Sequence, residues 1–235
     1  MPDISVRVAS YNIHKGVGTD RRRNPERILA VLSEIDADII ALQEADRRFG
    51  PREAVLPPLL IDRHTDYQVA PLNVQTDSIG WHGNSILVRK AATIRLSDII
   101  HLPCLEPRGA VMAEIELPDG KEVRIYGMHL DLSGLWRRRQ AAALLHRHAG
   151  ASAMPTLMAG DLNEWRNARG CLLDFARHFE FAPCGHSFPS ARPIGQLDRI
   201  MMNEHFELLE SGVHDSLLAR RASDHLPIWA DLRIR

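Results

Sequence analysis

Cysteine is scarce in this sequence, and so are the segments that direct a chain to a membrane or to secretion. The three cysteines, Cys104, Cys171 and Cys184, are odd in number and show no CxxC spacing. A disulfide framework is therefore not expected. A reducing, cytoplasmic location is expected instead. No apolar run approaches the roughly 20 residues that cross a bilayer. Residues 1–13 lack a basic segment followed by an apolar one, so no signal peptide is expected.

Charge of one sign is not in excess either. Lys and Arg number 29 against 30 Asp and Glu, which gives a formal net charge of −1. Proteins that hold long nucleic acids usually carry a basic stripe, so this balance does not indicate a nucleic-acid partner, although it does not exclude one. The 235 residues contain 45% hydrophobic and 25% charged side chains. We found no repeat or linker and expect one globular domain over residues 1–235.

Several motifs with defined chemistry are missing. The sequence has no HExxH, no Cys/His cluster and no EF-hand loop, so the common zinc and calcium sites are not indicated. It has no GxSxG, so a serine hydrolase lacks its usual marker. The "GVG" of residues 16–18 is too short for a phosphate loop and is not followed by GK[ST].

What is present is a mixture of strand and helix patterns. A helix is predicted after Asn24, a typical N-cap, with Pro25 at its first position and an apolar stripe that includes Leu32. Further helices are predicted over 133–149 and 171–179, and "PDG" (118–120) predicts a hairpin. This mixture predicts packed sheets covered by helices. Alternating or short apolar runs predict strands over residues 4–13, 38–44, 84–90, 110–117, 122–130, 155–161, 196–202 and 226–234.

Polar side chains gather where these strands begin or end, which is where α/β sheets place their ligands. Each one alone is better explained as a solvated loop residue, a cap or a hydrogen-bond partner. Together, carboxylates without paired His or Cys ligands favour a hard ion such as Mg²⁺ or Mn²⁺. With histidines as proton carriers, metal-assisted attack of water on a phosphoester is the chemistry that fits. The residues are Asn12, Glu44, His129, Asp161, Asn163, Asp198, Asp224 and His225.

Eight motifs carry a resemblance to a known family over about residues 7–232. They are "SYNIHKG", "IIALQE", "GNSILV", "EPRGAV", "MHLD", "AGDLNEW", "QLDRI" and "SDHLPI", in this order. The set resembles the endonuclease/exonuclease/phosphatase superfamily, which includes pancreatic-type deoxyribonucleases and neutral sphingomyelinases. The resemblance implies an α/β fold of the DNase I type, a four-layer α/β sandwich in which two mixed β-sheets pack face to face with helices outside.

The resemblance also implies a metal site. Glu44 matches the principal Mg²⁺ ligand, with Asn12 beside it and Asp224 near the ion, directly or through water. Mn²⁺ is the alternative ion. Whether one or two ions bind is left open.

The other matched positions imply catalytic roles. Asp161 and Asn163 match the pair that positions the attacking water and the phosphate. His225 matches the general base or transition-state contact, and Asp198 the acid that orients its imidazole. His129 matches the histidine that contacts the scissile phosphate. Whether Asp161 or His225 takes the water's proton is left open. If residues 161–163 stay extended, Asp161 and Asn163 face the same side.

The substrate is an anionic phosphoester whose identity the sequence leaves open. Arg108 and Asn84 are the candidates for binding it, although Arg108 is equally well explained as a loop charge. "RRR" (137–139) is more simply a solvated helix face, whereas "DRRR" (20–23) lies nearer the expected site.

The remaining conspicuous residues received no catalytic role. "HRH" (146–148) is interpreted as a surface feature, and Trp81, Glu164 and Trp165 as packing or loop residues.

We therefore expect a Mg²⁺-dependent phosphodiesterase or phosphatase acting on a lipid headgroup, a sugar phosphate or a short nucleic acid. The alternative is a DNA or RNA endonuclease or exonuclease. A binding domain without catalysis is a third interpretation, but it requires the loss of at least one of the matched site residues, and none is lost. Oligomeric state is left open.

Overall fold

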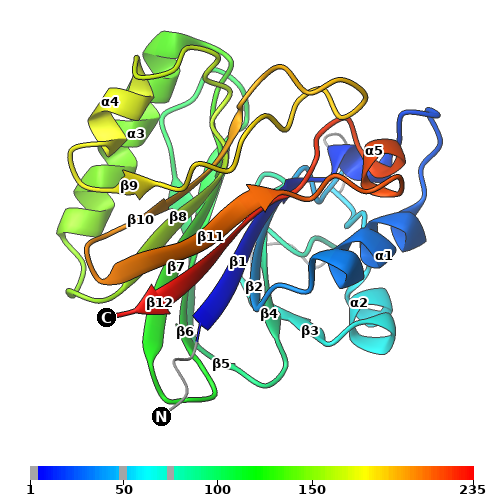
Figure 1. Ribbon diagram of the computed structural model, residues 1–235, viewed down its shortest axis with the longest axis horizontal. Coiled ribbons are helices and arrows are strands. Elements are labelled where there is room, and N and C mark those ends of the chain that lie inside the picture. The colour runs from blue at the N-terminus through cyan, green and yellow to red at the C-terminus, as the bar shows by residue number, and fades with distance from the viewer. Residues whose placement is uncertain (1–4, 48–51, 73–76) are drawn as a thin grey trace.

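Two mixed sheets of six strands each pack face to face, with helices on their outer faces, so that the chain forms four layers (Figure 1). The computed structural model describes residues 5–47, 52–72 and 77–235. Ile4, the first residue of the first predicted strand, lies outside these ranges. The predicted fold class is confirmed. No helix in the described ranges is long and apolar enough to span a membrane.

The first sheet has the strand order β11-β12-β1-β2-β4-β3. β1 and β2 are parallel, and the other pairs are antiparallel. Its outer face is covered by α1 (Pro25–Ile35), α2 (Pro58–His64) and α5 (Ala219–Ala222) (Figure 1). Its strands are β1 (Ser5–Asn12), β2 (Ile39–Gln43), β3 (Tyr67–Val69), β4 (Ser85–Arg89), β11 (Phe206–Val213) and β12 (Ile228–Ile234).

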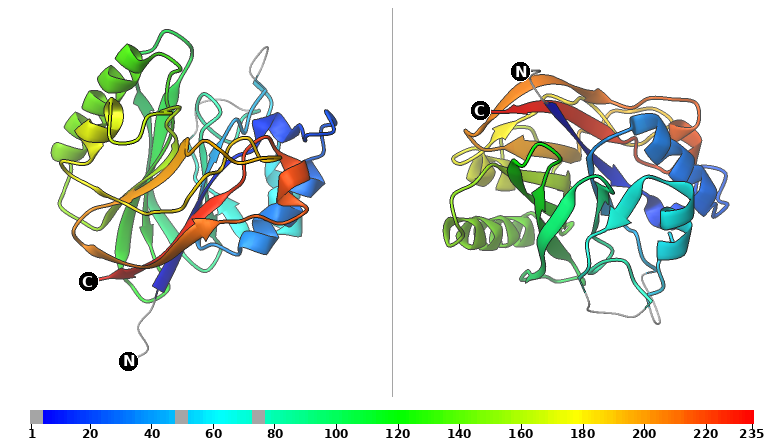
Figure 2. Two further views of the ribbon diagram at one scale, coloured as in Figure 1. Left: turned by 45° about the horizontal axis from the view of Figure 1, so that its top comes forward. Right: turned by 90° about the horizontal axis from the view of Figure 1, so that it is seen from below.

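The second sheet has the order β5-β6-β7-β8-β10-β9, with β7 and β8 parallel. α3 (Gly134–Ala149) and α4 (Cys171–Phe175) cover its outer face, and Figure 2 shows both sheets between the two groups of helices. A short 3-10 turn, η1 (His14–Gly16), follows β1. The strands of the second sheet are β5 (Thr93–His101), β6 (Gly109–Glu116), β7 (Glu122–His129), β8 (Thr156–Asp161), β9 (Glu180–Phe181) and β10 (Asp198–Met202).

The elements with strong local signals form as predicted. Asn24 caps α1 by accepting a hydrogen bond from the Arg27 main-chain N–H at 3.0 Å, and Leu32 lies on the buried stripe. The hairpin at residues 118–120 joins β6 and β7, with Gly120 at φ +82°, a conformation that costs glycine little. The helix predicted over 171–179 is shorter, because α4 ends at Phe175.

Four strands were not predicted, and all four lie at sheet edges. β3 and β11 bound the first sheet, and β5 and β9 bound the second. An edge strand pairs on one side only, and β5 and β11 are largely exposed or half-buried, so their apolar pattern is weak. The short helices α2 and α5 were missed as well.

Candidate active site

The inward-facing rows of side chains on six strands end in a polar residue at the same edge of the sandwich. In β8, for example, Leu157 and Ala159 belong to the core between the sheets, and Asp161 is the next residue of that row. Asp161 is in register with His129 of β7 on one side and with Asp198 of β10 on the other. The six residues that end these rows are Asn12, Gln43, Asn84, His129, Asp161 and Asp198, and all six are buried.

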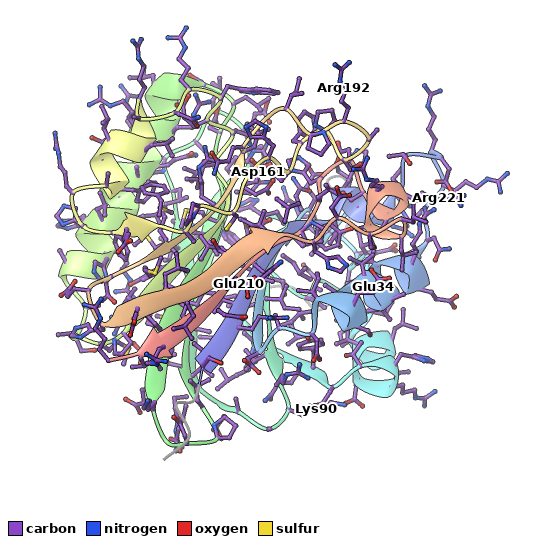
Figure 3. All side chains as sticks on the ribbon, in the orientation of Figure 1. Glu34, Lys90, Asp161, Arg192, Glu210 and Arg221 are labelled. Atoms are coloured by element: carbon purple, nitrogen blue, oxygen red, sulfur yellow. The ribbon has the colours of Figure 1, made fainter. Side chains whose placement is uncertain are left out.

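The carboxylate of Asp161 is the centre of this cluster. Asn12 donates a hydrogen bond from Nδ2 to Asp161 Oδ2 at 3.1 Å, and the Asn163 main-chain N–H donates to Oδ1 at 2.9 Å. Nε2 of His129 and of His225 lie 3.4 and 3.7 Å from Asp161 Oδ2. Burial alone raises the pKa of Asp161, but the two imidazoles outweigh it and lower the pKa below its usual range. The group is ionised at neutral pH. It lies at the end of the sandwich that also carries Arg192 and Arg221 (Figure 3).

His225 lies between two carboxylates. Its Nδ1 is 2.8 Å from Asp198 Oδ2, which also accepts a hydrogen bond from Ser187, and the ring of Phe188 covers it at 4.7 Å between centroids. Burial lowers the pKa of His225, but Asp198 and Asp161 outweigh it and raise the pKa to about 10. Ligand atoms of these three residues lie within 4.8 Å of one another. Because both nitrogens of the charged ring face carboxylates, it has no lone pair for a metal, and we interpret the trio as carboxylate–imidazolium–carboxylate.

Glu44 supplies a second acidic group, directed into an adjacent pocket. It follows β2 at φ +55°, an uncommon conformation that turns the chain at this edge. Burial raises the pKa of Glu44, but His129 and the ion-paired Lys15 outweigh it and lower the pKa. Asp46, Arg108 and His129 line the same pocket. The half-buried Glu44 carboxylate, compensated here by an ammonium, has the oxygen chemistry that Mg²⁺ and Mn²⁺ prefer.

Arg108 and Asn84 occupy different positions relative to this pocket. Nη1 of Arg108 lies 2.8 Å from both ring nitrogens of His129, so the guanidinium packs against the imidazole beside the pocket. Asn84 is fully buried and donates from Nδ2 to the main-chain oxygen of Gly109 at 2.9 Å. It therefore ties the two sheets together behind the pocket wall.

Asn163 departs from the expected geometry, and Asp224 lies beside His14. Asn163 is at φ +51° and β8 ends at Asp161, so the premise of an extended segment over residues 161–163 is wrong. Asn163 nevertheless stays in the cluster, because its Nδ2 donates to the Leu130 main-chain oxygen at 2.9 Å, next to His129. Asp224 Oδ1 lies 3.7 Å from Nδ1 of His14 and accepts a hydrogen bond from Ser223 Oγ at 3.4 Å.

Sequence reasoning missed a buried ion pair beneath the site. Arg137, expected on a solvated face, is 8% exposed, and its Nη2 lies 3.0 Å from Oε2 of Glu164. Its Nη1 donates to the main-chain oxygen of Leu132, so Arg137 joins the loops that follow His129 and Asp161. The signal was present in the helix, where Arg137 begins an i, i+3, i+4, i+7 stripe with the buried Gln140, Ala141 and Leu144.

Trp165 is 56% exposed and packs against the Phe188 ring, in agreement with its interpretation as a loop or packing residue. The interpretation of "HRH" needs correction in part. His148 is partly buried between Tyr126 and Phe179, whereas the other members of "HRH" are exposed as expected. Lys15, in the motif "SYNIHKG", was not assigned a role from the sequence, although it is the ion-pair partner of Glu44.

Two mixed six-stranded sheets packed into a four-layer sandwich match the DNase I-like fold. The sequence profile of the Endonuclease/Exonuclease/phosphatase family matches residues 9–225. The chain belongs to this family, whose members hydrolyse phosphoester bonds and generally depend on divalent metal ions.

Individual relatives span the whole chain. It is 29% identical over 260 aligned residues to YbhP of Escherichia coli K12, described as uncharacterized, with 100% of both chains covered. A mannosyl-6-phosphatase of Bacteroides thetaiotaomicron has a similar fold (TM-score 0.77, 17% identity, 97% and 99% of the chains covered). So does TDP2 of D. rerio complexed with a single-strand DNA product (TM-score 0.72, 17% identity, 98% and 100% covered).

Proposed function

We propose that this protein is a Mg²⁺-dependent phosphoesterase that hydrolyses a phosphodiester or phosphomonoester by attack of water, with Mn²⁺ as an alternative ion. The observation that carries the proposal is the environment of Asp161: a buried, ionised carboxylate beside two imidazoles and two donors, next to the pocket that Glu44 lines. A structural ion pair would not need two histidines and an adjoining pocket.

In this proposal the buried cluster orients water and the phosphate. Asp161 accepts a hydrogen bond or proton from the attacking water, and Asn163 helps to hold the phosphate beside it. His225, kept cationic between Asp198 and Asp161, stabilises the negative charge that develops in the transition state. Its raised pKa favours this electrostatic role and makes Asp161 the better candidate for the base. Asp198 orients the imidazole, and His129 contacts the scissile phosphate.

The metal belongs to the Glu44 side of the cluster. Glu44 would hold the ion together with Asn12, whose Oδ1 already accepts a hydrogen bond from the His14 main-chain N–H at 3.1 Å. Asp224 would contribute through water, because its described contacts are with His14 and Ser223. A bound Mg²⁺ would offset the negative charge of the phosphate. Arg108 would contact the phosphate from the pocket wall, and Asn84 would position that wall.

The substrate is a small anionic phosphoester, such as a lipid headgroup or a sugar phosphate, with DNA or RNA cleavage as the second candidate function. Fold neighbours include both a sugar phosphatase and a DNA-bound protein, so the fold itself does not select between these substrates. The near-neutral charge favours the small substrate. The three cysteines are unpaired, which supports a reducing, cytoplasmic location.

A phosphoester panel tests the proposal. The purified protein is stripped with EDTA and assayed with Mg²⁺ or Mn²⁺ against phosphomonoesters, bis-p-nitrophenyl phosphate, phospholipids and supercoiled plasmid, with Asp161→Asn as the blank. We expect hydrolysis that depends on the added metal ion and is abolished by EDTA. Salt-sensitive plasmid nicking would select the nuclease. Absence of hydrolysis across the panel, with metal binding retained, would instead favour a binding domain without catalysis.

A further inference from the structure

A second groove, which shares no lining residue with the Glu44 pocket, is rich in arginine. We call it the arginine groove; it is lined by, among others, Leu132, Arg138, Asn163, Trp165, Arg166 and Arg169. Its empty space amounts to about 1050 Å³ when the open mouth is included. Asn163 connects it to the cluster, because its main-chain N–H bonds to Asp161. The groove therefore adjoins the cluster at Asn163.

The positive charge of the groove is not balanced locally. Glu164 neutralises Arg137 beneath it, and Arg138 lies 3.3 Å from Asp174. Arg166 and Arg169 are exposed, and neither side chain has an ion pair within the described ranges. Free guanidinium groups in a concave site are the groups that bind phosphate by paired hydrogen bonds.

A further feature makes the groove more than a charged surface. Trp165 and Leu132, which also line it, are 56% and 61% exposed and add apolar surface to the groove that holds the free arginines.

We propose that the arginine groove binds a second phosphate of the substrate, separated from the scissile phosphate by a ring or short carbon spacer that packs on Trp165. Arg166 and Arg169 bind this second phosphate. The inference rests on the proposed function only for the identity of the scissile group, because binding can be measured without turnover. The substrate class is thereby narrowed to phosphoesters that carry a further phosphate.

Binding of matched ligands tests the groove directly. By calorimetry we expect thymidine 3′,5′-bisphosphate to bind the wild type about 10-fold more tightly than thymidine 5′-monophosphate, the effect of one added charge-assisted contact. Arg166→Gln/Arg169→Gln should remove this preference. The matched control, Arg177→Gln/Arg235→Gln, also removes two charges but from a cavity between α4 and the C-terminus, and should keep it. No preference in the wild type, or an equal preference in the groove variant, would overturn the proposal.

A kinetic comparison separates this inference from the proposed function. The 5′-p-nitrophenyl phosphate ester of thymidine is compared with the same ester bearing a 3′-phosphate. We expect kcat/KM about 10-fold higher for the second ester in the wild type and in the Arg177→Gln/Arg235→Gln control, and no difference in the groove variant. If neither ester is cleaved while the calorimetric preference persists, the groove stands and the catalytic proposal for these esters fails. If both are cleaved equally by the wild type, the groove proposal fails and catalysis stands.

Discussion

At the level of single residues, the charge on His225 determines how the cluster works. Its imidazole lies 2.8 Å from Asp198 and 3.7 Å from Asp161, so both carboxylates stabilise the positive charge of the ring. Asp198 is 1% exposed and meets His225 and Ser187. We infer that Asp198 acts through His225 rather than on the phosphate.

This arrangement predicts non-additive losses of turnover. His225→Gln should lower kcat roughly 10²-fold or more, and Asp198→Asn by about 10-fold or more. The double variant should be no slower than His225→Gln alone, because Asp198 affects turnover only through His225. Steady-state kcat for the four proteins measures this cycle. Losses that multiply would show that Asp198 acts independently of His225.

The Arg137–Glu164 pair predicts a difference between two neighbouring arginines. Arg137→Met should lower the free energy of unfolding by about 3–5 kcal/mol, because it leaves Glu164 charged and buried without its partner. Arg138→Met, which breaks the more exposed pair with Asp174, should cost less than about 1 kcal/mol. Urea unfolding measures both. Equal effects would mean that Arg137 does not join the two loops.

At the level of elements, the sequence patterns predicted the central strands of both sheets but not the edge strands. β1, β2, β7, β8 and β10 bury residues on both faces, and their alternating or short apolar runs were enough to predict them. β5 and β11 were missed because exposed and half-buried residues interrupt their pattern. The strand ends that carry the site belong to the central strands, which is why most of the site was predictable.

α3 carries a histidine that should make stability sensitive to acid. His148 packs against Tyr126 and Phe179, and burial lowers its pKa, reinforced by Arg124 and His178 and opposed by Glu204. The unfolded chain then binds more protons than the folded one below about pH 6.5, so stability falls as pH drops through that value. His148→Phe should reduce the loss measured by urea unfolding between pH 7.5 and pH 5.5. His146→Phe, at an exposed position on the same helix, should leave the loss unchanged; a reversed order would contradict this.

At the level of the whole molecule, the two sheets share one core. Residues of β1, β2, β4 and β12 pack between the sheets with residues of β6, β7, β8 and β10. Neither sheet can separate without exposing this core. We therefore expect residues 5–235 to unfold in a single transition, with coincident far-UV circular dichroism and tryptophan fluorescence curves in urea. Two separated transitions would indicate more than one domain.

The convergence of the site is also a property of the whole molecule. Strand ends could be located in the sequence, but the register that sets Asp161 against His129 and Asp198 could not. Asn163 was expected to extend the strand, yet the chain turns there at φ +51°. The helical stripe indicates that Arg137 faces inward, but not that its partner is Glu164, 27 residues away. Contacts of this kind come from packing between elements, which local sequence patterns do not encode.

The central claim is that Asp161 is the reaction centre of a metal-dependent phosphoesterase. It is tested most directly by kcat for bis-p-nitrophenyl phosphate, measured with Mg²⁺ for the wild type, Asp161→Asn and the exposed-site control Asp119→Asn. We predict a loss of roughly 10²-fold or more for Asp161→Asn at unchanged circular dichroism, full activity for the control, and no activity for any of the three proteins in EDTA. Turnover by Asp161→Asn within about threefold of the wild type in the same assay would contradict the claim.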